Sequence, residues 1–172
     1  MRLRVEALLQ SRHRRGIFGG MTAAPIHVSV LPAEVLEWLD PRPGQIIVDG
    51  TLGGGGHTRL IAEKIGGEGG FVLALDRDPA AIASAEQRLA GLPIKIAQAN
   101  FCELPQVLDE LEIKTVDAVL LDLGLSSDQL AYVERGFSFE SEGPLDLRFS
   151  TDEGESAANL IARLPERELA DV

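Results

Sequence analysis

The sequence IIVDGTLGGGGH, from Ile46 to His57, contains the pattern that best predicts the fold of this chain. Its first residues form an apolar run of the length of a buried strand, which ends at Asp49. The glycines that follow let the backbone turn sharply and let a ligand approach the main chain closely. A strand, a glycine loop and a helix that begins near Thr58 form the first unit of many nucleotide-binding sheets. Because phosphate sites use the same glycine device, the loop alone does not identify the ligand.

The same alternation of strand and helix continues along the chain. Short apolar runs predict three more strands at 71–75, 94–97 and 116–121, and helices are predicted at 58–65, 78–89 and 103–111. Strands that alternate with helices of this length form βαβ units and a parallel sheet. We therefore predict an α/β fold, a Rossmann-like parallel sheet of about four strands with flanking helices. Residues 126–150 are predicted to form an ordered loop region, and 157–164 a short helix.

Three of the predicted strands end in an acid: Asp49, Asp76 and Asp122. In such sheets ligands bind at the carboxyl ends of the strands, where the strand order reverses. Asp76 stands where an acid accepts hydrogen bonds from the two hydroxyls of a ribose, although it could instead cap the helix that follows. Asp49 would repel a pyrophosphate, whereas it suits a cofactor that carries a sulfonium and an ammonium group. The pattern therefore favours S-adenosylmethionine over NAD.

Four further motifs are more specific than the glycine loop. They are HVSVL at 27–31, VLLDLGLSSDQL at 119–130, RGFSF at 135–139 and GPLDLR at 143–148. Together with the loop they resemble the bacterial family that methylates the N4 amino group of a cytosine in small-subunit ribosomal RNA. The resemblance implies a class I methyltransferase fold, S-adenosylmethionine as cofactor and ribosomal RNA as substrate. One departure is Asp128, which stands where the family usually has proline.

The resemblance also implies which residues bind the cofactor. The family's contacts fall on Gly55, Gly56, His57, Asp76, Phe101, Asp122 and Gln129, and the loop spacing adds Asp49 and Gly53. Members of the family continue well beyond the length of this chain. We therefore expect the chain to be the N-terminal part of such an enzyme, truncated at its C-terminus, with doubtful activity of its own.

Methylation of an amino group requires alignment of the nucleophile and an acceptor for its N–H bonds. Asp122, at the end of a strand beside the glycine loop, is the candidate for that acceptor, although it could serve only as a cofactor contact. Ser126 and Ser127 could add hydroxyl contacts to the base or its backbone.

The RGFSF segment has two interpretations. Phe137 and Phe139 could pack over a flipped base while Arg135 and Arg148 hold a phosphate, or the loop could be pinned to the core with both arginines paired to acids; the second is favoured.

Composition adds expectations about partners and location. The formal net charge is −11, yet residues 1–20 hold five arginines and one glutamate, so the remainder carries about −15 and is a poor non-specific binder of nucleic acid. We expect a basic, disordered extension at 1–24 and a cofactor-binding domain at 25–172.

The sequence has no signal-peptide pattern or apolar run of membrane-spanning length, and its single Cys102 excludes an internal disulfide, so a cytoplasmic protein is expected. The three histidines lack ligand spacing, so no metal is expected.

Several alternatives remain open at this point. The same fold could methylate a small molecule, the glycine loop could serve an NAD-dependent oxidoreductase, or the chain could be an inactive cofactor-binding fragment. The oligomeric state is not determined by the sequence, and a dimer is among the alternatives.

Overall fold

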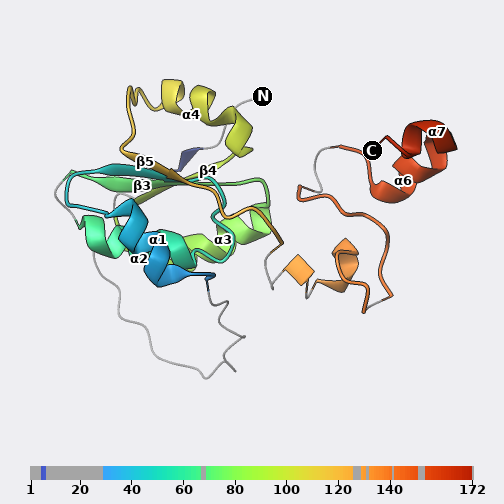
Figure 1. Cartoon of the computed structure of the whole chain (residues 1–172), viewed down its shortest axis with the longest axis horizontal. Helices are drawn as coiled ribbons and strands as arrows, with labels where there is room; N and C mark the ends of the chain where they lie inside the picture. Colours follow the sequence, from blue (N-terminus) through green and yellow to red (C-terminus); the bar gives the residue numbers. More distant parts are fainter. Residues whose placement is uncertain are drawn as a thin grey trace.

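A computed structural model describes residues 5–6, 29–66, 69–125, 129–130, 132–140, 142–150 and 154–171. Its centre is a sheet whose strands follow the order β1-β4-β3-β2-β5 (Figure 1). The strands β2 (Ile46–Asp49), β3 (Phe71–Asp76), β4 (Ile94–Gln98) and β5 (Ala118–Leu120) run parallel. The chain winds outward from β2 to β4 and then returns to place β5 on the other side of β2. The predicted Rossmann-like sheet is therefore confirmed, with its reversal of order between β2 and β5.

The strand β1 (Val5–Glu6) pairs antiparallel with β4. These two residues lie in the segment 1–24, for which we expect disorder, and they take part in the sheet. The rest of that segment lies outside the described residues, so the expectation for it stays a prediction.

Helices cover both faces of the sheet. Figure 1 shows α1 (Pro32–Leu39), α2 (Gly56–Ile65) and α3 (Pro79–Arg88) on one face and α4 (Leu104–Glu110) on the other. The predicted helices agree with α2, α3 and α4 to within two residues at each end. The helix α1 was not predicted from the sequence, and none of its residues is fully buried.

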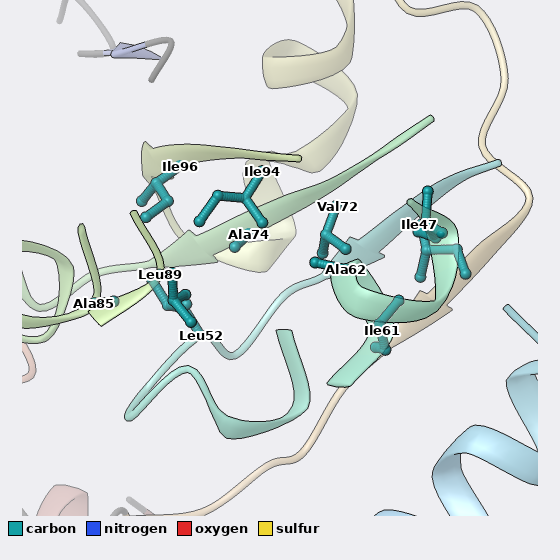
Figure 2. Packing of buried hydrophobic residues seen from close by; sticks show 11 residues of the cluster. Ile47, Leu52, Ile61, Ala62, Val72, Ala74, Ala85, Leu89, Ile94 and Ile96 are labelled. Carbon is teal, nitrogen blue, oxygen red and sulfur yellow. The ribbon is translucent and has the colours of Figure 1, made fainter. Parts of the chain in front are cut away.

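The sheet residues alternate between two cores, as the two-residue period of a strand requires. Towards α2 and α3 the buried side chains include Ile47, Ile61, Val72, Ala74, Leu89 and Ile96 (Figure 2). Towards α4 they are Val48, Leu73, Leu75, Ala97, Ala99 and Val107. Because β2 and β3 are buried on both faces, their positions relative to each other are fixed, and so are the loops at their carboxyl ends.

Local signals explain where the helices begin. The Asp78 side chain accepts a hydrogen bond from the Ala80 N–H at 2.9 Å, and Pro79 occupies the first turn of α3. Before α4, Asn100 and Glu103 form a reciprocal capping box around the short 3₁₀ turn Phe101–Glu103. Both caps lie at the carboxyl edge of the sheet, so they also fix the direction in which the chain leaves that edge.

The described residues after β5 form few regular elements. They contain a 3₁₀ turn at Val133–Arg135, then α6 (Ala157–Arg163) and α7 (Glu166–Leu169), which lie beyond the end of the sheet (Figure 1). The predicted helix at 157–164 is thus confirmed as α6. No described helix is both long enough and apolar enough to span a membrane.

The core on the α4 side gives the first prediction. Leu73 is fully buried in the middle of β3, so Leu73→Ala leaves a cavity and is expected to lower the free energy of unfolding by about 2–5 kcal/mol. Leu123→Ala removes the same atoms from a side chain that is 66% exposed and is expected to change stability by less than about 0.5 kcal/mol. Urea unfolding followed by circular dichroism measures both, and equal effects would contradict this description of the core.

Candidate functional site

A cavity of about 510 Å³ lies at the carboxyl edge of the sheet, where the order of β2 and β5 reverses. The glycine loop after β2, the turn after β3, the start of the 3₁₀ turn after β4 and the loop after β5 all contribute to its wall. Its lining contains two carboxylates, Asp76 and Asp122, and two aromatic rings, Phe101 and Phe149. The volume falls within the roughly 300–1,000 Å³ typical of small-molecule sites.

The glycine loop adopts backbone conformations that side chains disfavour. Gly53 has φ +46° and Gly55 has φ +76°, both in the left-handed region. A Cβ atom on Gly55 would also lie 2.9 Å from the Leu89 Cδ1, so this glycine lets the loop pack against the end of α3. Gly53 lines the cavity, and its N–H donates to the Asp76 Oδ2 at 2.8 Å. Gly55 thus allows close packing against α3, whereas Gly53 brings the main chain to the cavity.

Asp49 lies behind the cavity wall and is only 1% exposed. Its Oδ2 accepts a hydrogen bond from the Thr58 hydroxyl at 2.6 Å, and its Oδ1 accepts from the N–H of Thr51 at 3.0 Å and from the Thr51 hydroxyl at 3.3 Å. Burial raises the pKa of Asp49, and the hydrogen bonds from Thr58 and Thr51 oppose that shift. The carboxylate therefore holds the loop and the first turn of α2 in place and does not itself line the cavity.

Asp76 faces the cavity with its carboxylate held by the backbone. Its Oδ2 accepts the Gly53 N–H, and its Oδ1 accepts the Asp78 N–H at 2.9 Å. Burial raises the pKa of Asp76, against the effect of these two hydrogen bonds. The helix cap of α3 is Asp78, so the sequence alternative in which Asp76 caps that helix is not what the structure shows. Each Asp76 oxygen keeps acceptor capacity, which suits a pair of hydroxyl donors.

Asp122 and His57 meet across the cavity. The Asp122 N–H donates to the Thr51 hydroxyl at 2.8 Å, which ties the loop after β5 to the glycine loop. The His57 Nε2 lies 3.6 Å from the Asp122 Oδ2, and the His57 Nδ1 is buried without a hydrogen-bond partner in the described part of the chain. The Asp122 side chain remains 44% exposed, so it can receive a further group.

The predicted site residues can now be located. Seven of the predicted cofactor residues line the cavity: Gly53, Gly56, His57, Asp76, Phe101, Asp122 and Gln129. Asp49 and Gly55 stand behind the wall, in the positions described above. Ser126 and Ser127 lie outside the described residues, so their predicted contacts with a base stay predictions. No group of three or more His, Cys, Asp or Glu side chains suited to a metal ion occurs within the described ranges.

The RGFSF segment matches the pinned-loop interpretation in most respects. Arg135 pairs with Asp78, and Arg148 binds Asp146 through its Nε and its terminal nitrogen at 2.8 and 2.7 Å. The Arg148 guanidinium lowers the pKa of Asp146 to about 2. Phe137 packs against Phe149, with 5.4 Å between the ring centroids. Phe139, in contrast, is fully exposed.

Sequence reasoning did not find several residues that shape the site. Thr51 and Thr58 carry the hydrogen bonds of Asp49, and Phe149 lines the cavity from a distant part of the chain. The spacing Asp-x-Thr could have suggested a local hydrogen bond, since a short polar side chain two residues on often binds back. No local pattern indicates Phe149, because its position depends on how the loop 132–150 folds back.

A model of the MraW methylase family matches residues 24–172. The chain is 48% identical over 145 residues to the ribosomal RNA small subunit methyltransferase H of Pelobacter propionicus, covering 83% of this chain and 46% of that protein. It is 50% identical over 148 residues to the protein of the same name from Geobacter sulfurreducens, covering 85% and 47%. The chain therefore spans about half the length of the curated relatives it matches. Among solved structures, a protein-L-isoaspartate O-methyltransferase aligns with a TM-score of 0.43 at 20% identity, covering 55% of this chain and 29% of that one.

The burial of Asp49 gives a prediction for pH dependence. A carboxyl group whose pKa is raised on folding stabilises the folded chain less as the pH rises above the unfolded value of 3.8. In Asp49→Asn this titration is absent. The free energy of unfolding of the wild type is therefore expected to fall relative to that of Asp49→Asn as the pH rises from 3.8, as measured by urea unfolding at several pH values.

A matched variant sharpens this test. Thr58→Val keeps the Asp49 carboxyl but removes a hydrogen bond that lowers its pKa, so its stability is expected to fall more steeply with pH than that of the wild type. If the free energy of unfolding of the wild type instead rises relative to that of Asp49→Asn as the pH increases, folding stabilises the ionised form of Asp49, and the prediction is wrong.

Proposed function

Since the chain belongs to the MraW methylase family, we propose that it catalyses methyl transfer from S-adenosylmethionine to the N4 amino group of a cytidine in small-subunit ribosomal RNA. The name shared by the relatives, ribosomal RNA small subunit methyltransferase, supports the substrate class. The observation that carries the proposal is the cavity with Asp76 and Asp122 in its lining, at the reversal of strand order beside the glycine loop. A site on ribosomal RNA would also place the protein in the cytoplasm.

The residues of the cavity fit the cofactor in hydrogen bonding, charge and apolar surface. Asp76 is oriented by two backbone N–H groups and has acceptor capacity left for the ribose hydroxyls. The helix α2 begins at Gly56 without a side-chain cap, so its first N–H groups and its positive dipole suit the carboxylate of the methionine part. Phe101 offers an apolar ring in the wall for the adenine. When bound, the cofactor supplies an electrophilic methyl group on a sulfonium.

The paired carboxylates argue against a dinucleotide in the same cavity. The lining contains two carboxylates against the single arginine Arg77, a balance that favours a cationic donor over a pyrophosphate. This arrangement is the reason for preferring a methyltransferase over an NAD-dependent oxidoreductase.

Asp122 is the residue that we assign to the amino group of the base. Its main chain is fixed by the Thr51 hydroxyl, and its carboxylate stands at the cavity with a 44% exposed side chain. An acceptor at this point turns the nitrogen lone pair towards the methyl group by holding an N–H bond. The bound cofactor would supply the methyl group and keep the sulfur as leaving group, and Asp122 would accept the proton that the amino nitrogen gives up. A base in a stem must leave its stack to reach this point.

The binding prediction concerns Asp76. Asp76→Ala removes the acceptor for the ribose hydroxyls and is expected to weaken S-adenosylhomocysteine binding by roughly 10- to 100-fold in isothermal titration calorimetry. Asp109→Ala removes an exposed acid of α4 and is expected to leave the affinity unchanged. NADH is expected not to bind. Tight binding of NADH, or an unchanged affinity in Asp76→Ala, would contradict the assignment of the cavity.

The transfer prediction concerns Asp122 and the substrate. The chain, with methyl-labelled cofactor and small ribosomal subunits, is expected to label the amino group of a cytidine, identified by mass spectrometry of the digested RNA. Asp122→Asn is expected to slow the transfer by about 10²-fold while changing the affinity for S-adenosylhomocysteine by less than about threefold, because asparagine keeps an acceptor oxygen. Labelling of small amines but not of RNA would favour a small-molecule methyltransferase, which the acidic surface permits.

A further inference from the structure

One wall of the cavity comes from the loop 132–150, far in sequence from the glycine loop. Phe149 supplies this wall, and no feature of its own neighbourhood in sequence explains why it lies there. We propose that Arg135 is a positioning residue that holds Phe149 in the wall of the cofactor cavity, so that the loop 132–150 is part of the cofactor site. This inference rests on the proposed function, because the ligand it concerns is the cofactor.

The guanidinium of Arg135 is committed to the backbone on both sides of Phe149. One terminal nitrogen of Arg135 donates to the carbonyl oxygens of Arg148 and Phe149, both at 2.6 Å. The main-chain carbonyl of Arg135 in turn accepts the Leu147 N–H at 3.1 Å. Hydrogen bonds from a charged donor are about twice as strong as neutral ones. The segment 147–149 is therefore held to Arg135 by its backbone, independently of the Phe149 ring.

The other side of Arg135 is anchored to the framework of the site. Its second terminal nitrogen lies 3.3 Å from the Asp78 Oδ2, and the two side chains are 14% and 3% exposed. Asp78 also caps α3 through Ala80, and its N–H holds the Asp76 Oδ1. The turn that orients the proposed ribose acceptor is thus the same turn that anchors Arg135, which places Phe149 relative to Asp76.

The ring of Phe149 is supported from behind. Phe137 lies against it at 5.4 Å between centroids, and the Arg135 guanidinium lies 5.8 Å from the centre of the Phe137 ring. Phe149 is only partly buried, and it lines the cavity, whereas Phe137 is absent from the lining. The two rings and the arginine form a bracket, which we call the Arg135 bracket (Arg135, Phe137 and Phe149).

The same contacts argue against a phosphate-binding role for Arg135. A side chain that is 14% exposed and has three oxygen partners has little capacity left for an RNA backbone. Its Nε is buried without a partner in the described part of the chain, so even the remaining donor does not face solvent. The arginine therefore acts through Phe149, not by contact with the substrate.

A double-mutant cycle tests the proposal. S-adenosylhomocysteine binding is measured by calorimetry for the wild-type chain, Phe149→Ala, Arg135→Met and the double variant. Phe149→Ala is expected to weaken binding by about three- to tenfold, the range of an aromatic contact. Arg135→Met is expected to weaken it by a similar factor, and the double variant by no more than about twofold beyond Phe149→Ala, because both changes remove the same contact.

Matched variants separate this role from general stability. Arg163→Met breaks the exposed pair of Arg163 with Glu155, neither of which lines the cavity, and is expected to bind like the wild type. Arg135→Lys keeps a positive charge but supplies one nitrogen where the guanidinium uses two. It cannot hold Asp78 and both carbonyls in the same geometry, so it is expected to weaken binding even if Arg135→Met does not fold. Thermal melts without ligand check that each variant is folded at the temperature of the titration.

The outcomes are distinguishable. If the wild-type chain does not bind S-adenosylhomocysteine, the proposed function is wrong and this inference is wrong with it. If the wild type binds but the folded Arg135 variants bind equally well, only the inference is wrong. Losses that multiply in the double variant would also overturn it, because Arg135 would then act through another group, such as Asp76.

Discussion

The structure of the site depends on one buried carboxylate, that of Asp49. Its oxygens accept three hydrogen bonds, from the backbone and hydroxyl of Thr51 and from the hydroxyl of Thr58. Thr51 accepts in turn from the Asp122 N–H, so a single group joins the end of β2, the first turn of α2 and the loop after β5. An unpaired carboxylate in this position would be strongly destabilising, since desolvation already raises its pKa. The loop conformation is therefore required by the burial of Asp49.

Sheet topology explains why these pieces can converge. Because β5 returns to the side of β2 opposite to β3, the loops after β2, β3 and β5 open on the same edge with β2 in the middle. The buried core on both faces of β2 and β3 holds these loops at fixed spacing. Asp76 and Asp122 then stand on opposite sides of the glycine loop, one held by backbone N–H groups and the other open to a second ligand. A cofactor site and an acceptor site thus share a single loop.

The sequence predicted the parts of the molecule that depend on local patterns. Buried strands and capped helices have clear periods and signals, which is why both ends of α3 were predicted to within one residue. The role of Asp49 could not be predicted, because an acid at the end of a strand has the same sequence signature whether it faces a ligand or the interior. The role of Gly55 was missed for a similar reason: its partner Leu89 is distant in sequence. Long-range contacts of this kind leave no periodic pattern.

The loop 132–150 illustrates how such a contact can still be recognised in a structure. The Arg135 side chain is only 14% exposed, has three oxygen partners and still leaves its Nε without one. Closing a loop in this way costs stability, since an apolar side chain would avoid the desolvation of both charges. An apolar side chain, however, could not donate to two successive carbonyls, and it is these bonds that fix the backbone on which Phe149 sits. The arrangement therefore makes sense if the position of that backbone matters more than the stability of the loop. A loop that contacts a ligand needs its backbone held at a fixed position, whereas a loop that only covers the core does not.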